Sequence, residues 1–417
     1  MNLLRFITAG SVDDGKSTLI GRLLYDSHAI FEDQLQAMRR ASRFSDSDTP
    51  DLAILTDGLK AEREQGITID VAYKYFSTPR RKFIIADAPG HVQYTRNMVT
   101  GASNCDLAII LIDARNGVAE QTRRHTYLTS LLGIKHLVVA VNKMDMIGYD
   151  EEAFYRIAAA FKKFANDLNF KTIHFIPVSA LHGENIVQES VHFAWYQGPA
   201  LLPYLETINT EDDETAGSAR FPVQWVIRPQ SDDLHDYRGY AGNVMSGKLR
   251  VGDLVGVFPG GQTSRIERIE MFGKELTEAE APNSIVLHLE DDIDVSRGDI
   301  IAPLSAAPIV SQELKARICW MDDEKNLVPG GKYLLQHHGK KVRCIVREIL
   351  DKIQIDTLQL VDAQNITLND IATIGIKTAS PLALDLYAQN RNNGAFILID
   401  EQTCRTVAAG MVLEVGV

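Results

Sequence analysis

The sequence predicts an α/β domain with a doubly wound, mostly parallel sheet, followed by two β-barrel domains. In the first half of the chain, short apolar runs alternate with amphipathic stretches, as expected for strands and helices that follow one another. In the second half, many short β-rich runs are separated by Gly, Asp and Pro, as in "GYAGNVMSGKLRVGDLVGVFPGG". The length of 417 residues also exceeds what one hydrophobic core usually serves.

The strands of the α/β domain are expected at near-continuous apolar runs, because a strand inside a parallel sheet is buried on both faces. In chain order these runs are "LRFITA", "KFIIAD", "DLAIILID", "HLVVAVN" and "IHFIPVS". Between them lie helical patterns such as "STLIGRLLYDS", in which Leu19, Ile20, Leu23 and Leu24 recur at helical spacing. A polar segment over residues 26–66 interrupts the alternation, and such segments are often mobile functional loops.

A change of composition marks the expected end of the α/β domain. The stretch "ETINTEDDETAGSAR" is acidic and polar, so we expect a linker there. A second boundary is expected near "SAAPIVSQE", between two groups of β-rich runs. The prediction is therefore an α/β domain over residues 1–207, a linker over 208–219, and β-barrels over 220–306 and 307–417.

The composition argues against several classes of protein. A formal net charge of −12 and a pI of about 5.4 disfavour a surface built mainly for nucleic acid backbones. The N-terminal stretch lacks the layout of a signal peptide, and no apolar run reaches the ~18 residues that a membrane-spanning helix needs. The cysteines form no C-x-x-C pair and are expected to be buried, reduced thiols: Cys105, Cys319, Cys344 and Cys404. We therefore expect a soluble cytoplasmic protein.

The first chemical motif is "GSVDDGKS", which fits the P-loop pattern G-x-x-x-x-G-K-[ST] between a predicted strand and a predicted helix. Backbone N–H groups of such a loop, together with the start of its helix, hold phosphate charge. Lys16 is expected to reach the outer phosphates, and the Ser17 hydroxyl to bind Mg²⁺. The predicted phosphate-binding residues are Gly10, Ser11, Val12, Asp13, Asp14, Gly15, Lys16, Ser17 and Thr18.

Two further motifs point to the base of the nucleotide. "NKMD" follows a strand run, and a carboxylate there can accept hydrogen bonds from guanine N1–H and the exocyclic amino group. Because adenine does not present these donors, Asp145 predicts GTP as the ligand. "SAL" follows the next strand and can offer backbone N–H to guanine O6. The predicted base-binding residues are Asn142, Lys143, Met144, Asp145, Ser179, Ala180 and Leu181.

Two more motifs concern the γ-phosphate and the metal. "DAPG" ends a strand at the carboxyl edge of the sheet, where α/β proteins bind ligands, so Asp87, Ala88, Pro89 and Gly90 are expected there. Asp87 would hold Mg²⁺ through water, and the Gly90 N–H would face the γ-phosphate. Thr68 in "GITID" would bind Mg²⁺ only while the γ-phosphate is present, which makes its loop an order–disorder switch. The predicted metal ligands are Ser17, Thr68 and Asp87.

The ordered set "GSVDDGKS", "EREQGITID", "DAPGH", "NKMD" and "SAL", with two predicted β-barrels after it, resembles the elongation factor Tu class of GTPases. Within that class, the stretches "YTRNMVTGASNCDLAIILIDARNGVAEQTRRHTYLTSLLGIKHLVVAVNKMD" and "YRGYAGNVMSGKLRVGD" are similar to the GTP-binding large subunit of bacterial ATP sulfurylase. In that family a regulatory GTPase is paired with a small subunit that adenylylates sulfate, and GTP hydrolysis drives this synthesis.

The resemblance implies GTP and Mg²⁺ as ligands and a small adenylyl-transferring subunit as partner, with no nucleic acid and no membrane. It also implies that His91, directly after Gly90, orients the water that attacks the γ-phosphate. The alternative is that His91 only packs between loops. Asp13 matches the class as well, which implies a role in holding the phosphate loop or a monovalent cation.

Motifs for adenylyl transfer are missing from the sequence. It contains no H-x-G-H and no S-G-G-x-D-S pattern, and only one Walker A pattern. The histidines of "HHGKK", residues 337–341, stand in the wrong order for such a motif and are expected at an exposed strand end. Two functions stay open: a GTPase subunit for sulfate activation, and a translation-factor GTPase that binds tRNA and the ribosome.

Overall fold

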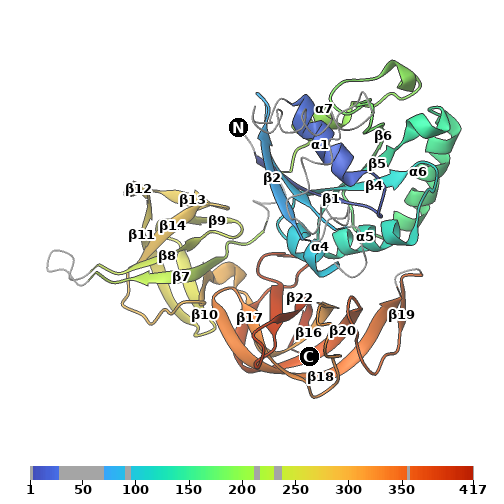
Figure 1. Cartoon of the computed structure of the whole chain (residues 1–417). Coiled ribbons are helices and arrows are strands. Elements are labelled where there is room, and N and C mark those ends of the chain that lie inside the picture. Colours follow the sequence, from blue (N-terminus) through green and yellow to red (C-terminus); the bar gives the residue numbers. More distant parts are fainter. Residues whose placement is uncertain are drawn as a thin grey trace. The chain divides into compact units, whose positions relative to one another are not determined.

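The structure, a computed structural model, describes residues 3–27, 70–89, 95–210, 217–229, 237–354 and 357–416. The chain divides into an N-terminal unit, Met1–Thr210 with Ile355–Thr357, and a C-terminal unit, Glu211–Gln354 with Leu358–Val417. The first unit is the predicted α/β domain, and the second contains both predicted β-barrels (Figure 1). The fold class expected from the sequence is therefore confirmed, whereas the limits proposed for the linker and the individual barrels stay predictions.

A six-stranded sheet in the order β2-β3-β1-β4-β5-β6 forms the centre of the N-terminal unit. Its strands are β1 (Leu3–Ala9), β2 (Ala72–Ser77), β3 (Lys82–Asp87), β4 (Leu107–Asp113), β5 (His136–Asn142) and β6 (Thr172–Pro177). The neighbours pair in parallel except β2 and β3, which are antiparallel. The sequence analysis missed β2, because this edge strand alternates exposed and covered residues instead of forming an apolar run.

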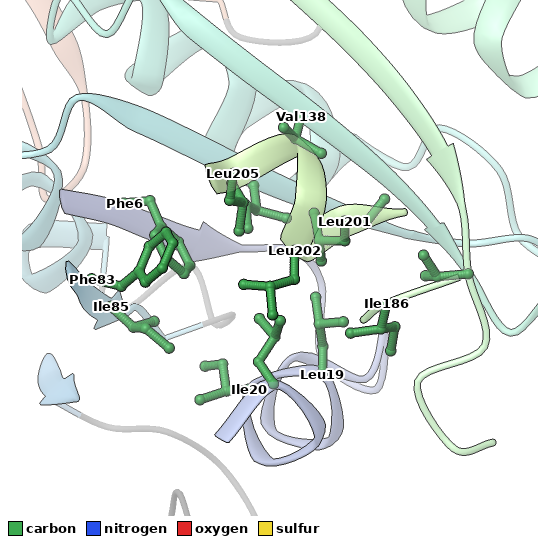
Figure 2. Packing of buried hydrophobic residues seen from close by; sticks show 14 of the residues in the cluster. Phe6, Leu19, Ile20, Phe83, Ile85, Val138, Ile186, Leu201, Leu202 and Leu205 are labelled. Atoms are coloured by element: carbon green, nitrogen blue, oxygen red, sulfur yellow. The ribbon is translucent and has the colours of Figure 1, made fainter. Parts of the chain in front are cut away.

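Helices cover the sheet on both sides (Figure 1). They are α1 (Lys16–Asp26), α4 (Thr95–Ala102), α5 (Glu120–Leu131), α6 (Glu151–Ala165) and α7 (Leu201–Thr207), with short 3₁₀ turns η3 (Met144–Ile147) and η4 (Val191–Phe193). Leu19 and Ile20 of α1 and Leu202 of α7 pack with Phe6 and Phe83 in one buried cluster (Figure 2). The apolar face predicted for α1 therefore packs against the sheet, and this packing holds in place the helix that follows the phosphate loop.

Each β-barrel of the C-terminal unit closes as a ring of six strands with one short strand attached, and β9 and β13 form a separate two-stranded sheet. The first ring is β10-β15-β7-β8-β14-β11, closed by β10 with β11, and the second is β17-β21-β22-β16-β20-β18, closed by β17 with β18. The strands of the first barrel are β7 (Phe221–Ile227), β8 (Gly239–Asn243), β9 (Lys248–Arg250), β10 (Leu254–Phe258), β11 (Gln262–Met271), β12 (Lys274–Leu276), β13 (Glu278–Glu280), β14 (Ser284–Leu289) and β15 (Ile300–Pro303), followed by the 3₁₀ turn η6 (Leu304–Ala306). The second barrel contains β16 (Ile309–Trp320), β17 (Lys332–His337), β18 (Lys340–Gln354), β19 (Gln359–Val361), β20 (Ile371–Leu384), β21 (Ala395–Ile399) and β22 (Thr406–Val415).

A buried ion pair joins the two barrels within the C-terminal unit. Arg220, just before β7, donates through two nitrogens to the carboxylate of Asp385, at 2.7 Å and 2.8 Å. Asn393 donates to the same carboxylate at 2.9 Å. His337 lies in this network, because its Nε2 is 3.0 Å from the Asn393 carbonyl oxygen and the residue is only 2% exposed. The expectation that "HHGKK" forms an exposed strand end is therefore wrong for His337, which is buried at the end of β17 in the second barrel.

Cys105, Cys319 and Cys344 are buried thiols, as expected. Cys404 is exposed, so the prediction of burial is wrong there: it lies in a turn before β22 with φ of 58°. Among the described residues, no helix is long and apolar enough to cross a membrane.

Candidate nucleotide-binding site

The predicted nucleotide-binding residues gather at one edge of the sheet in the N-terminal unit. The phosphate loop follows β1, and Asp87, Asp113 and Asn142 are the last residues of β3, β4 and β5. Thr8 pairs with Asp87, and Asp113 with Asn142, in the parallel registers of these strands. Since these carboxyl ends lie side by side, the separate sequence motifs form one site at the edge where α/β sheets bind ligands.

The phosphate loop is shaped by glycine and by a side chain from within the loop. Gly15 has φ of 90°, and a Cβ there would lie 2.4 Å from Nδ2 of Asn142, so the position admits only glycine. The Ser11 N–H donates to Oδ2 of Asp14 at 2.6 Å. The loop is therefore held in shape by its own residues before any ligand binds.

Lys16 is a buried cation at this loop. Its Nζ donates to the carbonyl oxygens of Gly10 at 3.1 Å and Ser11 at 3.0 Å. Burial lowers the pKa of Lys16, and the nearby carboxylates of Asp87, Asp14 and Asp13 act in the opposite direction. Because a buried ammonium group needs anionic partners, this position fits the phosphates of a nucleotide.

Asn142 and Lys143 connect the base-binding motif to the phosphate loop. Nδ2 of Asn142 donates to the Asp14 carbonyl at 2.8 Å, and its Oδ1 accepts from the Ala180 N–H at 2.9 Å. Lys143 has φ of 62°, and its Nζ donates to the carbonyl of Asp13. The two residues thus connect the phosphate loop, more than a hundred residues away in the chain, with the loops after β5 and β6.

Asp113 is a site residue that the sequence analysis missed. Its carboxylate receives Nη2 of Arg115 at 2.6 Å and Nζ of Lys143 at 3.1 Å. Burial raises the pKa of Asp113, but the hydrogen bonds from Arg115 and Lys143 outweigh it and lower the pKa to about 2. Asp113 is the last residue of a predicted strand, as Asp87 is. A residue at the carboxyl end of a buried strand lies at the edge of the sheet that binds ligands, so this rule applies to Asp113 as well.

The loop after β6 is held from two sides. Arg22 of α1 donates through Nε to the Ala180 carbonyl at 3.3 Å and through Nη2 to the Leu181 carbonyl at 2.6 Å. Ser179 and Glu184 exchange backbone hydrogen bonds at 3.2 Å and 3.0 Å. No local sequence signal identifies Arg22, because its partners lie more than 150 residues away.

Two of the three predicted metal ligands are described. Ser17 lies in the first turn of α1, and Asp87 is buried at the end of β3, where its Oδ1 accepts from the Thr8 hydroxyl at 3.4 Å. A hydroxyl and a carboxylate are oxygen ligands of the kind that Mg²⁺ prefers. Ala88 and Pro89 follow Asp87 as expected. Thr68, Gly90 and His91 lie outside the described residues, so their roles stay predictions.

Comparisons with known proteins agree with this site. A family model described as the elongation factor Tu GTP binding domain matches residues 1–216, and one described as GTP-eEF1A C-terminal domain-like matches residues 313–413. A solved structure of sup35 complexed with GDP covers 100% of this chain and 95% of that chain, at 21% identity and a TM-score of 0.45.

Curated relatives are more similar. The chain is 52% identical to sulfate adenylyltransferase subunit 1 of Aeromonas hydrophila, over 99% of this chain and 86% of that protein. The subunit 1 of Alteromonas mediterranea is 48% identical, over 99% and 87%. The bifunctional enzyme CysN/CysC of Mycobacterium tuberculosis is 52% identical, over 99% of this chain and 67% of that protein. The chain therefore belongs to the sulfate adenylyltransferase subunit 1 family, and it carries a GTP-binding domain of the elongation factor Tu type.

Proposed function

We propose that this chain is the GTPase subunit of a sulfate adenylyltransferase. Hydrolysis of GTP on this chain drives the formation of adenosine 5'-phosphosulfate and pyrophosphate from ATP and sulfate on a partner subunit. The observation that carries the proposal is the identity of 52% over 99% of the chain to a protein named sulfate adenylyltransferase subunit 1. The assembled phosphate and base loops support the GTPase half of the proposal independently.

Base selection rests on Asp145 and on the loop after β6. Asp145 lies in η3, two residues after the anchored Lys143, with Oδ2 3.9 Å from Nε2 of His182, and its carboxylate is the proposed acceptor for guanine N1–H and the exocyclic amino group. The N–H groups of Ser179 and Ala180 donate within the protein. We therefore assign the contact with guanine O6 to the N–H of Leu181, an exposed residue of the same loop.

The phosphates are held by the loop from Gly10 to Thr18, with Lys16 as the buried counter-charge. Mg²⁺, bound by the Ser17 and Thr68 hydroxyls and through water by Asp87, would neutralise charge on the β- and γ-phosphates. His91 orients the water that attacks the γ-phosphorus, and the bond between this phosphorus and the bridging oxygen of GDP breaks. Release of the phosphate frees the loop that carries Thr68, which makes that loop the switch.

The partner is a small subunit that transfers the adenylyl group, because the sequence of this chain contains no motif for that reaction. A cytoplasmic location belongs to the proposal as well, since four scattered cysteines suit a reducing compartment. The alternative, a translation factor that binds tRNA and the ribosome, has the same fold and the same GTP motifs. It is less supported, because the relatives at 48% and 52% identity are named as sulfate adenylyltransferase subunits.

An assay of pyrophosphate release tests the proposal. The chain, the small subunit that co-purifies with it, ATP and sulfate are combined with and without GTP. We expect sulfate-dependent pyrophosphate release that rises with GTP and needs both subunits. Equal release with and without GTP would contradict the proposal, and so would the lack of any co-purifying subunit.

A further inference from the structure

The lysine of the base-binding motif "NKMD" is held at its tip by two other segments of the chain. Nζ of Lys143 lies 3.1 Å from Oδ2 of Asp113, the last residue of β4, and it donates to the carbonyl oxygen of Asp13 in the phosphate loop. The backbone of Lys143 belongs to a third segment, because this residue directly follows β5. The side chain therefore extends from the end of β5 to both the end of β4 and the phosphate loop.

The backbone has an uncommon conformation at both residues that this hydrogen bond joins. Lys143 has φ of 62° and Asp13 has φ of 66°. Positive φ is uncommon in residues other than glycine, although aspartate tolerates it better than most. Such conformations persist where the surrounding contacts hold them, and they cluster at ligand-binding sites. The contact between Lys143 and the phosphate loop is therefore formed at a conformational cost.

Arg115 fixes the orientation of the Asp113 carboxylate. Its backbone N–H donates to Oδ1 at 2.9 Å, its Nε donates to Oδ1 at 3.0 Å and its Nη2 donates to Oδ2 at 2.6 Å. A guanidinium group that uses two nitrogens in this way sets one geometry for the carboxylate. Asp113 is only 2% exposed, and its backbone is in register with Asn142 of β5. The carboxylate thus has a fixed place beside Nζ of Lys143.

We propose that Asp113 is a positioning residue for guanine nucleotides and that it acts through Lys143. By holding Nζ beside the Asp13 carbonyl, Asp113 keeps the stem of Lys143 extended, so that its apolar side covers one face of guanine. A buried ion pair adds little stability compared with apolar side chains, so stability alone is a weak reason for this arrangement. The inference rests on the GTP site proposed above.

The affinities of the full chain for GTP and GDP, and the rates at which both nucleotides dissociate, provide the test. Asp113→Asn keeps the shape of the side chain and removes the charge that holds Lys143. We expect both nucleotides to bind about 5-fold to 10-fold more weakly, mainly through faster dissociation, which is less than the direct loss of a charge-assisted hydrogen bond. KM for GTP should rise by a similar factor. Turnover at saturating GTP should change little, because Lys143 contacts the base and not the γ-phosphate.

A double-mutant cycle with Lys143→Met separates positioning from an independent effect. Lys143→Met keeps an apolar stem and removes the ammonium group. In this background Asp113→Asn should change GTP affinity by less than about 2-fold, because a positioning residue has no further effect once its target is removed. Additive losses in the double variant would overturn the inference, and so would an unchanged GTP affinity in Asp113→Asn alone.

Two further variants guard against a general loss of structure. Arg115→Gln frees the carboxylate without changing Asp113, and it should weaken GTP binding by about 2-fold to 3-fold, since its guanidinium group is partly exposed. Asp370→Asn is the matched control, because Asp370 forms an ion pair of 2.8 Å with Lys352 in the second barrel. It should lower the free energy of unfolding and leave nucleotide affinity unchanged.

The control also separates the possible failures. A loss of GTP affinity in Asp370→Asn equal to that in Asp113→Asn would assign the effect to general destabilisation and overturn the inference. A wild-type chain that binds ATP as tightly as GTP would instead overturn the proposed GTP site.

Discussion

Asp145 is the residue on which the choice of nucleotide depends. Asp145→Asn replaces a carboxylate acceptor with an amide, so GTP binding should weaken by on the order of 3 kcal/mol, since two hydrogen bonds to a charged group change. Xanthosine triphosphate should bind better to the variant, because its C2 oxygen accepts from the new amide N–H. Calorimetric titration with GTP and with xanthosine triphosphate measures both affinities in the wild-type chain and in the variant. Equal GTP affinity in the variant would remove Asp145 from the base site.

His91 is the residue on which hydrolysis depends. His91→Ala should leave GTP binding nearly intact and slow hydrolysis by about 10²-fold to 10⁴-fold, the usual contribution of one positioned acid–base group. Thr68→Ala is the matched comparison: it should instead weaken the dependence of activity on Mg²⁺. Single-turnover phosphate release at saturating GTP distinguishes the two variants. Unchanged turnover in His91→Ala would assign His91 a packing role only.

At the scale of single elements, His337 at the end of β17 makes stability depend on pH. Burial is the largest effect on its pKa and lowers it from 6.5 to about 3. Below about pH 6.5 the unfolded chain therefore takes up a proton that folded His337 does not. The contribution of His337 to the free energy of unfolding is complete above pH 6.5. Between pH 6.5 and pH 3 it decreases with falling pH, by at most about 1.4 kcal/mol per pH unit.

Urea unfolding of the wild-type chain and of His337→Gln at pH 7.5, 6.0 and 5.0 measures this effect. The glutamine keeps a donor for the Asn393 carbonyl and removes the titrating ring. We expect the free energy of unfolding to fall less steeply with decreasing pH in the variant, whatever its stability at pH 7.5. Parallel slopes for the two proteins would show that the pKa of His337 does not differ between the folded and the unfolded chain.

The elements also differ in how far the sequence predicts them. Buried parallel strands such as β4 follow from apolar runs, and the P-loop follows from its spacing, because both patterns are local. The strand β2 was missed because an edge strand with one open face resembles a polar segment. The role of Arg22 and the burial of His337 depend on contacts between distant segments, which no local pattern encodes.

At the scale of the whole molecule, the central claim is that GTP hydrolysis on this chain is coupled to sulfate activation on another. Coupling requires that the two sites bias one conformational equilibrium. The loop predicted over residues 26–70, which contains Thr68, is the proposed two-state element. Locking this switch should uncouple the two reactions, because neither ligand then changes the equilibrium that the other site depends on.

The most direct measurement follows phosphate release from GTP by the full chain in two separate mixtures. One contains the small adenylyl-transferring subunit with ATP and sulfate, and the other contains ribosomes with charged tRNA. The account predicts slow hydrolysis by the chain alone, acceleration in the first mixture that disappears when sulfate is omitted, and no acceleration in the second. Acceleration by ribosomes, with none from the small subunit, ATP and sulfate, would contradict the account and favour a translation factor.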